Sequence, residues 1–85
     1  MKVLHLIRNS DDRLPEQIRR AIERIDGVEQ TLVLIQDGVY AVPPSVSAYA
    51  CAEDVRARGV QTDLELVDYE HIVRMIFEHD RVFTW

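Results

Sequence analysis

The sequence predicts a small α/β fold: a single domain, residues 1–85, with a four- or five-stranded, mostly parallel sheet flanked by helices. Apolar runs of strand length alternate with stretches in which apolar residues recur at helical spacing, a pattern typical of parallel sheets. The run at residues 31–35 consists of strand-forming residues throughout, as expected for a strand covered on both faces. With 85 residues, the chain has room for only one core.

The first strand is predicted at residues 2–7, where the sequence reads KVLHLI. A polar turn follows, and a helix is expected over residues 13–25 because apolar residues recur there on one face. Pro15 is compatible only with the first turn of this helix, and Gly27 is a typical helix stop.

The next strand is predicted at residues 31–36, in the centre of the sheet. It ends at Gln36, Asp37 and Gly38, and a single helical turn is expected at residues 39–42, before Pro43 and Pro44. A third strand is predicted at residues 46–51. The link between these strands is shorter than a usual parallel crossover. Either the two strands are not direct neighbours, or the connecting helix is reduced to one turn.

The second half of the chain repeats the alternation. A helix is predicted at residues 52–58 with Gly59 as its stop, a strand at residues 63–67, and a helix from Tyr69 to about His79 capped by Asp68. Its apolar positions include Ile72, Val73, Ile76 and Phe77. Residues 81–85 are expected to form either a last short strand or a docked tail.

Charge and cysteine content exclude several classes of protein. The net charge is −5 and the basic residues form no run, so the chain is not expected to bind nucleic acid directly. The single cysteine, Cys51, excludes an internal disulfide. The histidines have no ligand spacing with one another or with Cys51, so no metal is expected. No signal peptide or long apolar span is visible, so we expect a cytoplasmic protein without membrane contact.

Three stretches together resemble a known family: LIQDGVYA at residues 34–41, YACAEDVRARGV at 49–60 and LVDY at 66–69, followed by an amphipathic helix and the terminal Trp85. In order and spacing they are similar to the DsrE/DsrF/DsrH family, also called TusB/TusC/TusD. The chain most resembles the short TusB/DsrH subunit. The resemblance covers nearly the whole chain, except residues 42–46, where this sequence is shorter than typical members.

The resemblance implies a subunit of an intracellular sulfur-relay (sulfurtransferase) complex that needs no cofactor. Such complexes are heterohexamers of three related chains, so the partners implied are sister TusC/TusD-like (DsrF/DsrE-like) subunits, a sulfur donor and a sulfur acceptor. The relay implied here is 2-thiolation of the tRNA wobble uridine, and the alternative is dissimilatory sulfur oxidation. Because a domain of this size is marginally stable alone, the isolated chain is also expected to self-associate.

Cys51 is the candidate catalytic residue, as a persulfide carrier. TusB-like subunits often have an apolar residue at this position, and the first-helix cysteine of some DsrH-type chains is absent here. The spacing from Cys51 to Gly59 instead resembles the active-cysteine segment of the TusD/DsrE subunit. A strand end followed by a helix start favours a thiolate, and Arg56 and Arg58 add positive charge, whereas Glu53 and Asp54 oppose it. The competing interpretation is a buried, inert cysteine in a non-catalytic structural subunit.

Gln36, Asp37, Gly38 and Trp85 are candidate interface residues. Each also has a structural interpretation, because Gly38 and Asp37 suit a turn and Trp85 can anchor the tail on its own domain. His5, in mid-strand, is expected to be a hydrogen-bonded core or interface residue. A different class, a stand-alone nucleotide-binding domain, is disfavoured because acidic residues occupy the turn after the first strand, where a glycine-rich phosphate loop would lie.

Overall fold

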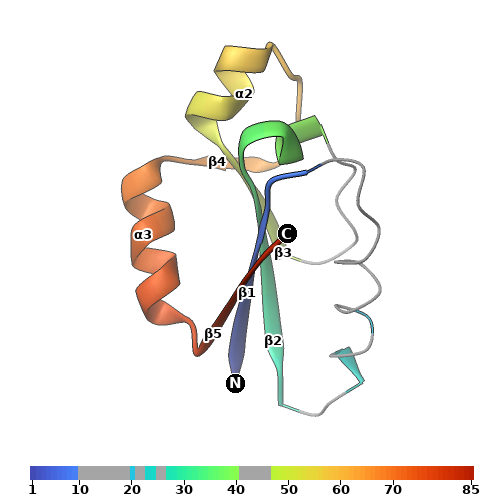
Figure 1. Cartoon of the computed structure of the whole chain (residues 1–85), viewed down its shortest axis with the longest axis vertical. Coiled ribbons are helices and arrows are strands. Elements are labelled where there is room, and N and C mark those ends of the chain that lie inside the picture. Colours follow the sequence, from blue (N-terminus) through green and yellow to red (C-terminus); the bar gives the residue numbers. More distant parts are fainter. Residues whose placement is uncertain (10–19, 21–22, 25–26, 41–46) are drawn as a thin grey trace.

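The computed structural model confirms a small α/β domain with a five-stranded sheet, and all the strand pairs in it are parallel (Figure 1). It describes residues 1–9, 20, 23–24, 27–40 and 47–85. The elements in chain order are β1 Lys2–Ile7, β2 Glu29–Leu34, η1 Gln36–Tyr40, β3 Ser47–Cys51, α2 Ala52–Arg58, β4 Glu65–Val67, α3 Tyr69–Glu78 and β5 Arg81–Thr84. Most of the helix predicted at residues 13–25 and part of the turn predicted at residues 39–42 lie outside the described residues.

The strands follow the order β4-β3-β2-β1-β5, so β2 is the central strand, as predicted. It begins two residues earlier than expected, because Glu29 and Gln30 pair with Lys2 and Val3 of β1. The last residues of the chain form a strand rather than a docked tail, and β5 pairs with β1. The described sheet therefore ends at β4 on one edge and at β5 on the other.

The described part of the short link after β2 is a 3-10 turn, η1. β2 and β3 are direct neighbours in the sheet, and the connection between them contains η1. This turn begins three residues earlier than predicted, at Gln36, whose φ of 50° lies in the left-handed region. The reduced-helix alternative is therefore correct.

Two apolar clusters cover the two faces of the sheet. Helix α3 covers one face, where Ile72 and Met75 pack on a buried cluster that includes Leu4, Val33 and Cys51. On the other face η1 and α2 contribute Val39 and Val55, which pack with residues of β1, β2 and β3. Figure 1 shows that η1 and α2 both lie at the carboxyl-end edge of the sheet, while α3 runs alongside it.

Helix α3 places its four predicted apolar positions on two different sides. Ile72 is buried and Ile76 packs on the core, as expected for an inward face. Val73 and Phe77 are instead exposed, and Phe77 retains 85% of its accessible surface. The helix therefore has an apolar side directed away from its own core.

Candidate functional site

Cys51 is fully buried in this structure. It is the last residue of β3 and the N-cap of α2, and its exposed fraction is 0%. Its side chain belongs to the cluster under α3, together with Val67 and Ile72. The predicted strand-end, helix-start position is correct, but the thiol lies inside the core and not on the surface.

One helical turn beyond Cys51, the carboxylate of Asp54 joins three segments of the chain. It accepts hydrogen bonds from the backbone N–H of Gln36 at 2.8 Å, from the hydroxyl of Tyr69 at 2.9 Å and from Nη1 of Arg58 at 3.3 Å. These donors come from η1, the first residue of α3 and the end of α2. Asp54 is itself buried, with 8% of its surface exposed. We call these four residues the Asp54 cluster.

Hydrogen bonding keeps Asp54 ionised although it is buried. Burial alone raises the pKa of a carboxyl group, but the hydrogen bonds from Gln36, Tyr69 and Cys51 and the charge of Arg58 outweigh it, and the pKa of Asp54 falls below its ordinary value. The same contact raises the pKa of Tyr69, because its hydroxyl donates to Asp54 and also lies beside Cys51. Within the Asp54 cluster, an ionised carboxylate and a neutral phenol therefore lie beside the buried side chain of Cys51.

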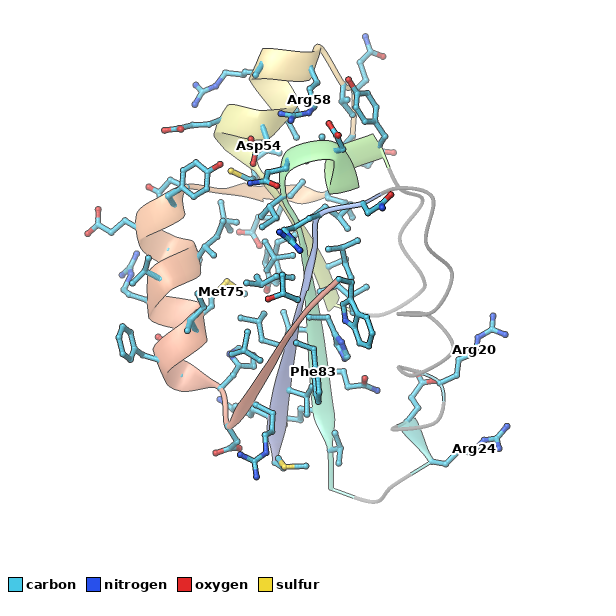
Figure 2. The ribbon with its side chains drawn as sticks, viewed as in Figure 1. Arg20, Arg24, Asp54, Arg58, Met75 and Phe83 are labelled. Carbon is cyan, nitrogen blue, oxygen red and sulfur yellow. The ribbon has the colours of Figure 1, made fainter. Side chains whose placement is uncertain are left out.

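Asp37 and Gly38, two of the interface candidates that follow the central strand, have clear structural roles. Asp37 is exposed and accepts a hydrogen bond from Nε of Arg58 at 3.0 Å, which ties η1 to α2. Gly38 lies directly against β1, so an added Cβ would overlap the carbonyl oxygen of Ile7 and lie 2.6 Å from its carbonyl carbon. Only glycine fits at this position. Figure 2 places Asp54 and Arg58 together at this end of the sheet.

Trp85 is half-buried and packs on its own domain. Its indole Nε1 donates to Nδ1 of His5 at 3.1 Å, and Nε2 of His5 lies 2.9 Å from Oε1 of Gln30. Because the indole N–H can only donate, Nδ1 must accept, and His5 is neutral with its proton on Nε2. His5 is thus the hydrogen-bonded core histidine that the sequence predicts. An interface role for Trp85 stays a prediction.

Asp54 and Tyr69 are the site residues that sequence reasoning missed. In the sequence Asp54 stands out only as an acid in the first turn of a predicted helix, and Tyr69 only as the first residue of the next predicted helix. The spacing did carry a signal, since Asp54 lies three residues after Cys51 and four before Arg58, which brings all three to neighbouring turns of one helix. The contact with Tyr69 is tertiary and has no counterpart in local spacing.

Comparisons with known proteins agree with this fold and with the family that the sequence resembles. The protein TusB of Buchnera aphidicola subsp. Acyrthosiphon pisum (strain 5A) is 29% identical over 90 residues, which cover 98% of this chain and 83% of that protein. The crystal structure of the ychN protein from E. coli superposes with a TM-score of 0.70 at 18% identity, over 100% of both chains.

A second solved structure has the same fold. MTH1491 from Methanobacterium thermoautotrophicum, described as a protein of unknown function, gives a TM-score of 0.72 at 20% identity, over 99% of this chain and 98% of that one. A family model described as "DsrH like protein" matches residues 11–82, which is most of the chain. The chain therefore belongs to the DsrH-like protein family.

Proposed function

We propose that this chain is a subunit of a cytoplasmic sulfur-relay complex that serves 2-thiolation of the tRNA wobble uridine. Membership of the DsrH-like family and the relative named TusB support a sulfur-relay role. The tRNA branch follows from the resemblance to TusB, while a DsrH-type role in sulfur oxidation is the alternative. No helix in the part of the chain that the structure describes is long and apolar enough to cross a membrane.

Within such a complex we assign the chain a structural, non-catalytic role. The observation that carries this assignment is the 0% exposure of Cys51. Sulfur transfer requires a thiolate that attacks the sulfane sulfur of a donor persulfide, so that the donor leaves as a thiolate. A donor protein must reach the attacking sulfur, and in this conformation core side chains surround it. The carrier role of Cys51 stays a prediction, and its burial argues against it.

The proposed partners are sister subunits of the TusC/TusD (DsrF/DsrE) type, one of which would supply the carrier cysteine. The sulfur donor and acceptor proteins would then meet the complex through that sister chain. Gln36 and Asp37 are exposed at the carboxyl-end edge of the sheet and remain candidate contact residues for a sister subunit. Direct contact with tRNA is not part of the proposal, because the chain carries a net charge of −5.

The proposed pathway is tested by deleting the gene and measuring 2-thiouridine in digested tRNA by mass spectrometry. We expect the 2-thiouridine content to fall strongly and to return when the wild-type gene is restored. An unchanged content in the deletion strain would exclude the tRNA branch. A deletion strain that keeps its 2-thiouridine but loses the ability to oxidise sulfur would favour the alternative branch.

Purification of the tagged chain from its own cells tests the assembly. Sister chains of the same fold should co-purify in equal amounts. A chain that is recovered without sister chains at physiological salt would contradict the subunit role, whatever the result for tRNA.

A further inference from the structure

One continuous stretch of the chain, which forms β4 and α3, covers the side chain of Cys51. In the sheet Cys51 pairs with Val67 of β4. Its side chain lies in the buried cluster to which Val67 also belongs and to which α3 contributes Ile72 and Met75. Figure 2 shows Met75 between α3 and the strands. We call residues 65–78 the cover segment, because they lie over a thiol whose exposed fraction is 0%.

Only a few side chains hold the cover segment on the core. β4 has three residues, lies at an edge of the described sheet and pairs there with β3. Two of these three residues, Glu65 and Leu66, are exposed. Of the ten residues of α3, only Ile72 and Met75 are buried, whereas β1 buries five of its six. A segment that buries so few apolar side chains opens at a lower free energy than the whole domain unfolds.

Hydrogen bonds fix the two ends of α3. Just beyond its carboxyl end, the backbone N–H of Asp80 donates to the carbonyl oxygen of Lys2 at 2.8 Å, and the N–H of Lys2 donates to Oδ2 of Asp80 at 2.7 Å. At its first residue, the hydroxyl of Tyr69 donates to Asp54 at 2.9 Å. Among the side-chain hydrogen bonds between described residues, this is the one that joins α3 to α2. The hydroxyl of Tyr69 also lies beside Cys51, so this bond is the attachment next to the thiol.

We propose that the cover segment opens as a unit while the rest of the domain stays folded, and that the hydrogen bond from Tyr69 to Asp54 is the latch that limits this opening. The bonds at Asp80 keep the carboxyl end of α3 on β1, so the start of α3 moves away and uncovers Cys51. Asp54 stays on α2, where its other two hydrogen-bond donors hold it. The structural role proposed above needs only the closed state, so the inference holds whether or not Cys51 carries sulfur.

Alkylation of Cys51 tests the latch, because the full chain has a single cysteine and its labelling reports on this thiol alone. The folded chain is incubated with iodoacetamide, and the rate at which it gains one carbamidomethyl group is followed by intact mass. The sulfur attacks the carbon that carries iodine and iodide leaves, so the reaction requires the open state. Tyr69→Phe keeps the ring and removes the hydroxyl, and it should raise the labelling rate about fivefold.

Gly27→Ala is the matched control for global unfolding. Gly27 lies in the turn before β2 at a φ of 80°, so alanine there destabilises the domain without touching the cover segment. If the thiol is reached through opening of the cover segment, this variant should be labelled at the wild-type rate. The labelling rate of the wild type should also change little in low urea, since a local opening exposes little surface.

Backbone hydrogen exchange gives an independent measurement of the same opening. In the wild type, the amide protons of α3 should exchange faster than those of β1 and β2. Gly27→Ala should accelerate exchange in β1 and β2, which requires global unfolding, and leave exchange in α3 unchanged. Tyr69→Phe should accelerate exchange in α3 about fivefold, as it does the labelling.

Equal acceleration of labelling by Tyr69→Phe and Gly27→Ala would overturn the inference, because the thiol would then be reached only when the whole domain unfolds. An unchanged labelling rate in Tyr69→Phe would overturn it as well, since the hydrogen bond to Asp54 would then not hold the cover segment closed. Neither result bears on the sulfur-relay role, which the tRNA measurement tests separately.

Discussion

Replacing Asp54 with alanine removes the acceptor that η1, α2 and α3 share. The backbone N–H of Gln36, in a left-handed conformation, loses its 2.8 Å hydrogen bond, and the hydroxyl of Tyr69 loses one of 2.9 Å. A hydrogen bond to a charged group contributes about 1.5–3 kcal/mol, and water can replace part of this at the half-exposed ring of Tyr69. We expect Asp54→Ala to lower the free energy of unfolding by about 2–3 kcal/mol, which in a domain of this size lowers the melting temperature by about 10–20 °C.

Urea denaturation followed by circular dichroism measures this loss, and Asp37→Ala is the matched control. Asp37 also binds Arg58, but its side chain is 70% exposed, so its removal should cost less than about 0.5 kcal/mol. In a double-mutant cycle, Tyr69→Phe should cost about 1 kcal/mol in the wild type and close to nothing when Asp54 is already alanine. If Asp54→Ala costs no more than Asp37→Ala, the Asp54 cluster does not hold these segments together.

Three further predictions use the same stability measurement. Gly38→Ala should destabilise the domain by about 2–4 kcal/mol, because its Cβ would overlap the backbone of Ile7; Gly27→Ala, at φ 80° in open space, should cost only about 1 kcal/mol. Since folding lowers the pKa of Asp54, its contribution to the free energy of unfolding should be complete above about pH 4 and be lost as the pH falls below that. Asp54→Asn should lack this part of the dependence of stability on acid pH. Trp85→Phe should lower the free energy of unfolding by about 1 kcal/mol through the lost hydrogen bond to His5, and equal stability of the variant would contradict this. Nitrogen NMR of the wild type should show a neutral His5 ring with its proton on Nε2, and a proton on Nδ1 would contradict this.

The layer order and the strands could be predicted from the sequence because they depend on local patterns. Continuous apolar runs gave β1, β2 and β3, and glycine stops gave the end of α2 at Gly59, whose φ is 62°. The edge position of β5 could not be predicted, since a terminal RVFT segment suits a strand or a docked tail equally. Its place next to β1 depends on tertiary pairing.

The candidate site could be predicted only in part, for a physical reason. The position of Cys51 at a strand end was correct, but burial depends on what lies above a residue, and helix α3 comes from a distant part of the sequence. The same limit explains α3 itself. Ile72, Val73, Ile76 and Phe77 fit one broad apolar face, and only packing shows that Val73 and Phe77 face away from the core.

The measurement that tests the account most directly is sulfur loading of Cys51. The purified chain, with its sister subunits when they co-purify, is incubated with a protein persulfide donor, and its intact mass is measured beside that of Cys51→Ser. A structural role predicts that neither form of this chain gains a sulfur atom, while a sister chain does. A gain of one sulfur on the wild type that Cys51→Ser abolishes would contradict the structural role and establish Cys51 as a persulfide carrier.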